Sequence, residues 1–213
     1  LVFLSFTDSD LAALGTAWQK ADFPPLRLAK LTDLKHPYSV DLWLESVATH
    51  AKTIVVRLLG GMDYWRYGVE QLAAAARVRD IRLVFIPGDY QEDSRLVTAS
   101  TVEPGIVRHL WSLFQNGGPA NMQSALQFMA GGILQPVAKV QAFGALTGAC
   151  GCEVQGAPRA LIVFYRSAYL SDDFEPVSAL AEALQKRGFH TCAVYVSSLK
   201  DPAATDPMRH HLS

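Results

Sequence analysis

The chain has 213 residues, of which half are apolar and 18% are charged, and its formal net charge is −1. This composition is typical of a globular protein and not of a disordered one, and the near-zero charge argues against a nucleic-acid surface, which is generally basic. No apolar run approaches the roughly 18 residues that a membrane span requires, and no leader pattern opens the chain. We therefore expect a cytoplasmic protein that binds neither nucleic acid nor membrane.

Short apolar segments alternate with segments of helical periodicity over the first 90 residues. Strands are predicted at 1–6, 26–29, 53–58 and 81–86, and helices at about 8–20, 36–51 and 63–80. The later two strands are almost wholly apolar, as strands covered on both faces are. This alternation predicts an α/β fold with a doubly wound, mostly parallel sheet flanked by helices.

The second half of the chain is less regular. Helices are predicted at 102–114 and 120–129, and strands at 160–165 and 191–196 enclose a helix that Asp172 or Asp173 caps and Gly188 ends. The segment 131–158 contains six glycines and two prolines without a clean period.

These patterns predict three parts. A flavodoxin- or Rossmann-like α/β domain spans 1–130, a Gly-rich connector spans 131–158, and the start of a second α/β domain spans 159–213. The first methionine is Met62 and the chain opens directly on an apolar strand. We therefore expect a fragment whose first domain is truncated at its start and whose second domain is truncated at its end.

The segment 53–67 carries the strongest local signal for a ligand. A strand ends at Leu58, two glycines follow, and a helix is expected to open near its candidate N-cap, Asp63. Ligands of open α/β sheets bind at the carboxyl ends of strands, where Gly60 and Gly61 allow positive φ and a close approach, and a helix start favours an anion. The spacing matches neither the dinucleotide nor the P-loop fingerprint, and a tight connection without a ligand is the simpler interpretation.

Aromatic and basic side chains near such turns are the other candidates for ligand binding. Tyr64, Arg66 and Tyr67 follow the glycines, whereas Trp65 belongs to the apolar stripe of the helix. Arginines bind carboxylates bidentately, so the arginines at strand ends favour a flat, carboxylated ligand; they are Arg57, Arg66 and Arg166. His36 precedes a proline at a helix entrance, where a capping or surface position is the more common one.

No self-sufficient catalytic or metal-binding set is evident. Asp89 is a candidate base, but a turn former is the simpler interpretation. Cys150 and Cys152 are too closely spaced for a C-x-x-C metal site, the histidine pair at 210–211 lacks further ligands, and three cysteines do not suggest a disulfide framework. Nucleophile-elbow, H-E-x-x-H and EF-hand spacings are absent from the sequence.

Several segments, taken together and in order, resemble the N-terminal region of the large subunit of aerobic cobaltochelatase. They are 31–45 (LTDLKHPYSVDLWLE), 51–67 (AKTIVVRLLGGMDYWRY), 87–89 (PGD), 162–167 (IVFYRS) and 194–200 (VYVSSLK). The resemblance covers nearly the whole chain and is weakest over 115–158. The magnesium chelatase large subunit is a related alternative, to which the runs around His36 and Gly60 are less similar.

The resemblance implies ATP-dependent insertion of Co²⁺, a substrate, into hydrogenobyrinic acid a,c-diamide during cobalamin biosynthesis. It implies that the large subunit binds the corrin and that AAA+ ATPase motor subunits use ATP and Mg²⁺, so a fragment alone is expected to be inactive. It implies no catalytic residue here. A ligand-crevice or lid role is implied for His36, Arg57, Gly60, Gly61, Tyr64, Arg66, Tyr67, Tyr165 and Arg166.

Two alternatives from other classes remain open at this point. A non-catalytic module that docks the motor subunits through its helices fits the same pattern of elements. An unrelated flavodoxin-like or response-regulator-like domain fits the first half, although a response regulator needs an acidic cluster at strand ends, for which only Asp89 is a candidate.

Overall fold

The computed structural model describes residues 1–89, 91–146, 156–196, 199, 204 and 206. It divides into two compact units, Leu1–Ala138 and Lys139–Ser213, and each is described by itself. The division falls inside the segment predicted as a connector, 131–158. Within the described ranges, no helix combines the length and the apolar character that spanning a bilayer takes.

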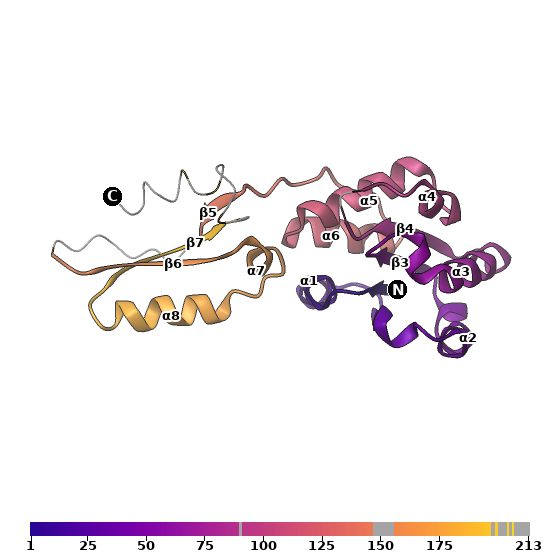
Figure 1. Ribbon diagram of the computed structural model, residues 1–213, viewed down its shortest axis with the longest axis horizontal. Helices are drawn as coiled ribbons and strands as arrows, with labels where there is room; N and C mark the ends of the chain where they lie inside the picture. The colour runs from indigo at the N-terminus through magenta and orange to yellow at the C-terminus, as the bar shows by residue number, and fades with distance from the viewer. Residues whose placement is uncertain (90, 147–155, 197–198, 200–203, 205, 207–213) are drawn as a thin grey trace. The chain divides into compact units, whose positions relative to one another are not determined.

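Strands and helices alternate along the first unit (Figure 1). In chain order they are β1 (Val2–Ser5), α1 (Asp8–Gln19), β2 (Arg27–Lys30), the 3₁₀ helix η1 (Leu31–Leu34), α2 (Pro37–Ser46), η2 (Ala48–His50), β3 (Thr53–Leu58), η3 (Met62–Trp65), α3 (Arg66–Arg79), β4 (Arg82–Pro87), α4 (Ser94–Ala99), α5 (Pro104–Asn116) and α6 (Pro119–Met129). The strands and long helices predicted for this region are present. Helix α4 was missed because six residues are too few to show a helical period.

The strands of the first unit form one parallel sheet in the order β2-β1-β3-β4. The chain passes from β1 to β2 at one edge and then returns past β1 to β3, so its direction of travel reverses between β1 and β3. Open α/β sheets bind ligands at the carboxyl ends of the strands that flank such a reversal. The predicted doubly wound, mostly parallel fold is confirmed.

Helices cover both faces of this sheet. Helices α2 and α3 pack on one face, and α1, α5 and α6 pack on the other. Successive residues of β3 point alternately to the two faces, so Ile54 and Val56 join the first core and Val55 joins the second. All three are fully buried, which explains why this strand is apolar on both sides.

The start of the Gly-rich segment is held to the first unit by two buried polar side chains. The Gln135 amide donates to Ser124 Oγ at 2.8 Å. Asn121 of α6 accepts from the Ala138 amide at 2.8 Å and donates to the Ala138 carbonyl at 2.7 Å. Because Asn121 and Ser124 are both buried, these bonds satisfy polar groups that water does not reach.

The second unit contains a short mixed sheet. Its elements are β5 (Phe143–Ala145), β6 (Arg159–Tyr165), α7 (Arg166–Leu170), α8 (Glu175–Gln185) and β7 (His190–Val196), and the strand order is β5-β7-β6. Strands β6 and β7 are parallel and are joined through α8, as the predicted β-α-β unit requires. Strand β5 pairs antiparallel with β7 and lies within the segment predicted as a connector.

Two helix boundaries differ from the predictions. The helix expected over 36–51 ends at Ser46, because Val47 leaves the helical region at φ −126° and the chain continues as η2. Neither Asp172 nor Asp173 caps α8, which begins at Glu175 after Phe174. Instead, Asp172 adopts a left-handed φ of 58° and the Asp173 amide bonds to the Ala168 carbonyl, a pairing that closes the short helix α7.

The cysteines give one further correction. Cys192 on β7 is disulfide-bonded, a bond that the cysteine count did not predict. Cys150 and Cys152 lie outside the described residues, as do the histidines at 210–211.

Candidate functional site

The chain reversal between β1 and β3 creates a small crevice at their carboxyl ends. Its volume is about 210 Å³, and its lining combines residues after β1 with residues at the ends of β3 and β4. Phe6 and Leu59 contribute apolar surface. The polar lining consists of Ser5, Thr7, Ser9, Asp10 and Arg57.

A partly buried ion pair closes this crevice. The Arg57 guanidinium binds the Asp10 carboxylate and also donates to the Gly88 carbonyl at 3.3 Å. The side chains of Arg57 and Asp10 are only 15% and 12% exposed. Asp10 also accepts hydrogen bonds from the hydroxyls of Ser5 and Thr7. The predicted ligand-binding arginine therefore neutralises an internal carboxylate and ties three strand ends together.

Gly60 and Gly61 adopt φ angles of +83° and +72°, as the turn prediction requires. A Cβ on Gly60 would touch the Tyr64 ring at 3.4 Å, and a Cβ on Gly61 would lie 2.9 Å from Asp93 Oδ2. The same Asp93 oxygen accepts from the Met62 amide at 3.0 Å. The helix-start amide predicted to favour an external anion is thus occupied by a carboxylate of this chain.

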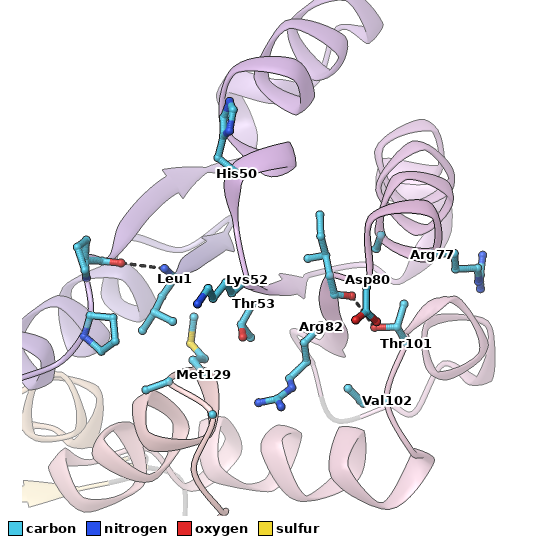
Figure 2. A pocket seen from close by; sticks show the side chains of 16 residues that line it. Leu1, His50, Lys52, Thr53, Arg77, Asp80, Arg82, Thr101, Val102 and Met129 are labelled. Carbon is cyan, nitrogen blue, oxygen red and sulfur yellow. Dashed lines mark hydrogen bonds between the residues drawn. The ribbon is translucent and has the colours of Figure 1, made fainter.

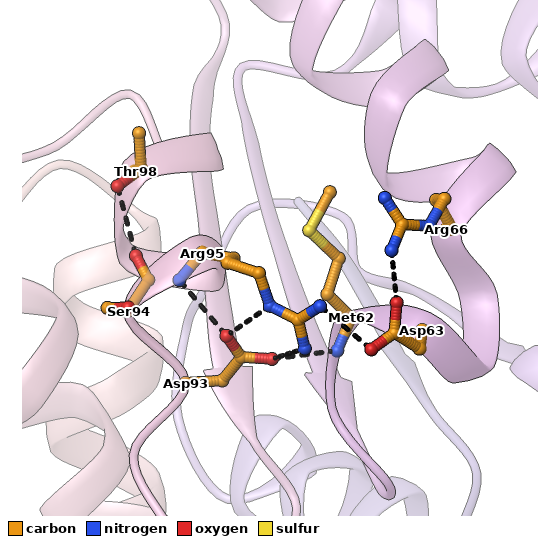
Figure 3. Close-up of polar contacts among 7 residues, drawn as sticks. All are labelled: Met62, Asp63, Arg66, Asp93, Ser94, Arg95 and Thr98. Atoms are coloured by element: carbon orange, nitrogen blue, oxygen red, sulfur yellow. Dashed lines mark hydrogen bonds and ion pairs between the residues drawn. The ribbon is translucent and has the colours of Figure 1, made fainter.

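Asp93 belongs to a network of two carboxylates and two guanidiniums (Figure 3). Arg95 bridges Asp93 and Asp63 at 2.8 and 2.7 Å, and Arg66 binds Asp63. The prediction that Asp63 is an N-cap is wrong, because the carboxylate lies within η3 and accepts from these side chains. Asp93 instead caps α4 by accepting from the Arg95 amide. The network joins the η3 turn to α4.

The guanidiniums hold both carboxylates in their charged form. Hydrogen bonding to Arg95 lowers the pKa of Asp93 to about 2, and the Met62 amide adds to the effect. Arg95 and then Arg66 lower the pKa of Asp63, which is exposed. Reciprocally, Asp93 and Asp63 raise the pKa of Arg95. Asp63, Asp93 and Arg95 therefore remain ionised at neutral pH.

An exposed aromatic surface lies beside the network, at the carboxyl ends of β1 and β3. We define it by four residues: Phe6, Lys35, Leu59 and Tyr64. The Tyr64 ring is 59% exposed and packs edge-on against Phe6 with 5.0 Å between centroids. The Lys35 ammonium lies 5.9 Å from the Tyr64 ring centroid, and Leu59 is 47% exposed. The surface thus presents aromatic and aliphatic area beside one positive charge.

His36 and Tyr67 are engaged with neighbouring groups. His36 is the N-cap of α2, where its Nδ1 accepts from the Tyr38 amide at 3.2 Å. The Tyr67 hydroxyl donates to Asp41 at 2.8 Å, and this contact raises the Tyr67 pKa. Both residues are exposed, but these hydrogen bonds tie them to neighbouring groups of the chain.

The seven predicted contact residues that belong to the first unit do not all lie together. Gly60 and Tyr64 are in direct contact, and Arg66 is nearby through Asp63. Arg57 points to the opposite face of the sheet, where its guanidinium carbon lies 5.8 Å from the Phe114 ring centroid of α5. The strand alternation that buries Val56 against α3 sends Arg57 towards α5.

Tyr165 and Arg166 belong to the second unit. Tyr165 ends β6 and is 59% exposed. Arg166 begins α7 and donates to the Val140 carbonyl at 3.1 Å. Nearby, Tyr169 stacks on Tyr195 with centroids 4.3 Å apart, and burial raises the pKa of Tyr195.

Several residues that shape this edge were missed by the sequence analysis. Sequence patterns indicate no role at this edge for Asp10, Asp93 or Arg95. An Asp-Ser pair before an apolar stretch was a usable signal for the cap at Asp93. No sequence signal pairs Asp10 with Arg57. Among the described residues, no three His, Cys, Asp or Glu side chains cluster closely enough to hold a metal ion.

Comparison with known proteins identifies relatives over almost the whole chain, although no family model matches. The chain is 34% identical over 98% of its length to aerobic cobaltochelatase subunit CobN of Sinorhizobium sp. It is 31% identical over 95% of its length to the subunit of the same name from Pseudomonas aeruginosa. The fold also matches the catalytic subunit of cobaltochelatase from Mycobacterium tuberculosis, with a TM-score of 0.75, 22% identity and 97% of this chain covered.

The match is confined to one part of each relative. The chain spans 18% of the length of both curated relatives and 17% of the solved chain. Within that span, two relatives are more than 30% identical to the chain, and one solved chain shares its fold. The chain therefore belongs to the family of aerobic cobaltochelatase subunit CobN.

Proposed function

We propose that this chain is part of the corrin-binding large subunit of an ATP-dependent cobaltochelatase, which inserts Co²⁺ into hydrogenobyrinic acid a,c-diamide. The observation that carries the proposal is the 34% identity to aerobic cobaltochelatase subunit CobN over 98% of the chain. The reaction is a ligase reaction that forms nitrogen–metal bonds in the complete complex. Its place in cobalamin biosynthesis follows from the same assignment.

The partners and cofactors follow from this assignment. AAA+ motor subunits hydrolyse ATP with Mg²⁺, and the chain itself contains no Walker A sequence. Co²⁺ reaches the complex as a substrate. We assign no catalytic residue to this chain, whose contribution is to help enclose the ring in the cytoplasm.

The aromatic surface is the part of the first unit best suited to contact a corrin. A corrin is a broad amphipathic ring with carboxylate and amide arms, so it needs apolar area and a few cationic groups. Tyr64, Phe6 and Leu59 offer the area, and Lys35 offers a cation. The nine residues predicted from the sequence remain proposed contacts, and among them Tyr64, which is 59% exposed, belongs to the aromatic surface.

Cobalt insertion by the reconstituted complex tests the proposal. The full-length subunit that carries this chain is combined with its motor subunits, ATP and Mg²⁺. Insertion of Co²⁺ into hydrogenobyrinic acid a,c-diamide is then compared with insertion of Mg²⁺ into protoporphyrin. We expect cobalt insertion only. Magnesium insertion instead would assign the chain to the magnesium chelatase alternative, and absence of both activities would refute the proposal.

A matched pair of tyrosines tests the aromatic surface in the same assay. We expect Tyr64→Ala to raise the KM for the corrin about three- to tenfold, as loss of one aromatic contact implies. Tyr38 of α2 is 65% exposed and lies outside the aromatic surface, so Tyr38→Ala is the control and should leave KM unchanged. Equal effects of the two substitutions would remove the aromatic surface from the proposal.

A further inference from the structure

A large cavity opens at the amino ends of the strands, at the edge opposite the predicted crevice (Figure 2). Its volume is about 830 Å³, within the range of small-molecule sites. Its lining includes Lys52, Arg77, Asp80, Arg82 and Met129. Sequence patterns did not predict a site here.

Positive charge dominates the lining. Lys52 precedes β3 and Arg82 begins β4, and Figure 2 shows both side chains reaching into the space between these strands and α6. Arg77 lies at the rim, where it donates to the Thr98 carbonyl. Asp80 is the acidic residue of this lining. The three basic side chains therefore outnumber the carboxylate.

The cations retain donors for a ligand. Arg82 Nη1 donates to the Phe128 carbonyl at 3.1 Å, and its guanidinium carbon lies 5.2 Å from the Phe128 ring centroid. These contacts fix the guanidinium, while its Nε and Nη2 make no described hydrogen bond. Lys52 is exposed and its ammonium has no acidic partner among the described residues. A fixed guanidinium and an ammonium without an acidic partner among the described residues, both lining one cavity, are suitable contacts for carboxylates.

Favourable interaction with helix dipoles explains the position of Arg82 but not that of Lys52. Helices α3 and α6 end at this edge, and cations near helix C-termini are stabilising. Arg82 serves this purpose through the Phe128 carbonyl. Lys52 does not, because it enters the cavity from the start of a strand and bonds to no helix carbonyl among the described contacts.

The cavity also has apolar walls. Ile81, Val102 and Met129 line it, and a neighbouring hollow of about 420 Å³ shares Arg82 and Val102. The hollow is otherwise lined largely by apolar groups, including Ile106, Phe128, Ile133 and Leu134. A ligand that spans both spaces would meet apolar surface along its body and cations at one end.

From this arrangement we propose that the amino-edge cavity binds an amphipathic polycarboxylate, with Lys52 and Arg82 as its carboxylate contacts. On the proposed function, that ligand is the corrin diamide. The cavity then forms a second contact region for the corrin, at the edge of the sheet opposite the aromatic surface. The combination of volume, paired cations and apolar walls distinguishes this cavity from the narrower crevice that Arg57 and Asp10 close.

Titration calorimetry of the 213-residue chain tests the inference directly. The probes are hydrogenobyrinic acid a,c-diamide, the same corrin with its free carboxylates converted to amides, and ATP. Lys52→Gln/Arg82→Gln should weaken binding of the diamide at least tenfold, and the amidated corrin should bind wild type comparably weakly. The control is Arg79→Gln/Lys139→Gln, which removes one exposed arginine and one exposed lysine outside the cavity and should change affinity less than twofold.

Because Arg82 also bonds to α6, Lys52→Glu provides a second variant that leaves that bond intact. It should weaken diamide binding at least tenfold without changing the thermal midpoint. Equal affinities of wild type and both cavity variants, or equal losses in the control, would overturn the inference. ATP binding with the same dependence on Lys52 and Arg82 would overturn the carboxylate assignment. Absence of corrin binding to this chain would overturn the cavity site alone, since the proposed function rests on metal insertion by the full complex.

Discussion

Replacing Asp93 with asparagine tests whether the carboxylate network holds the η3 turn against α4. In the structure, the Asp93 carboxylate accepts from the Met62 amide, the Arg95 amide and the Arg95 guanidinium. Its side chain is only 15% exposed. Asparagine keeps the size of the side chain and one carbonyl acceptor, so the substitution removes mainly the charge.

The expected loss follows from the Asp93 pKa. A fall from the ordinary 3.8 to about 2 corresponds to about 2.4 kcal/mol of native-state stabilisation at neutral pH. Arg95 is 48% exposed, so solvent screens the pair and we expect about 1–2 kcal/mol. Because the folded-state pKa is depressed, this stabilisation is complete above pH ~4 and disappears as the pH falls towards about 2.

Urea unfolding of wild type and Asp93→Asn between pH 7 and pH 2.5 measures both the size and the sign of the effect. We expect the variant to be less stable by about 1–2 kcal/mol at pH 7, with the difference shrinking below pH ~4. Glu92→Gln is the matched control, since Glu92 forms an exposed pair with Arg108 and should lose less than about 0.5 kcal/mol. A difference between Asp93→Asn and wild type that stays constant with pH would refute the electrostatic explanation.

Two further predictions concern packing and the buried ion pair. Gly68→Ala should destabilise the chain by about 1–3 kcal/mol in thermal melts, because the new Cβ would lie 2.2 Å from the buried Trp65 ring; Gly105→Ala, whose Cβ meets nothing within 4 Å, should be neutral or stabilising. Arg57→Met should cost about 3 kcal/mol in urea unfolding by leaving the Asp10 carboxylate unpaired. Adding Asp10→Asn should restore part of that loss, and a double variant no more stable than the single one would contradict the ion-pair explanation.

Local periodicity was a good guide to the elements of the first unit. The alternation of apolar strands and amphipathic helices predicted the order of elements from β1 to β4, because each element is specified by a pattern of a few residues. Helices α4 and α7 were not predicted, because their six and five residues are shorter than two helical turns, and neither was the short strand β5 (Phe143–Ala145). The left-handed φ of Asp172, just after α7, is a backbone angle that composition does not reveal.

The candidate site was harder to predict than the fold. Placing Gly60 and Gly61 in a strand-end turn was correct, since positive φ is the property for which glycine is suited. The partners of the charged residues were not predictable in the same way. Arg57 and Asp10 lie 47 residues apart, and Asp63 and Arg95 lie 32 apart. An arginine after a strand gives the same sequence pattern whether it binds a ligand or pairs with a carboxylate of the same chain.

The sequence alone therefore determined the α/β class, the order of strands and helices along the chain, and the resemblance to the cobaltochelatase large subunit. Only the tertiary structure decided which face of the sheet each charged side chain occupies, that Asp93 fills the anion position beside Gly61, and that Lys52 and Arg82 line one cavity at the amino edge. The physical reason is that periodicity and turn chemistry act over a few neighbouring residues. Charge pairing and cavity formation depend on the order and register of strands that are distant in the chain.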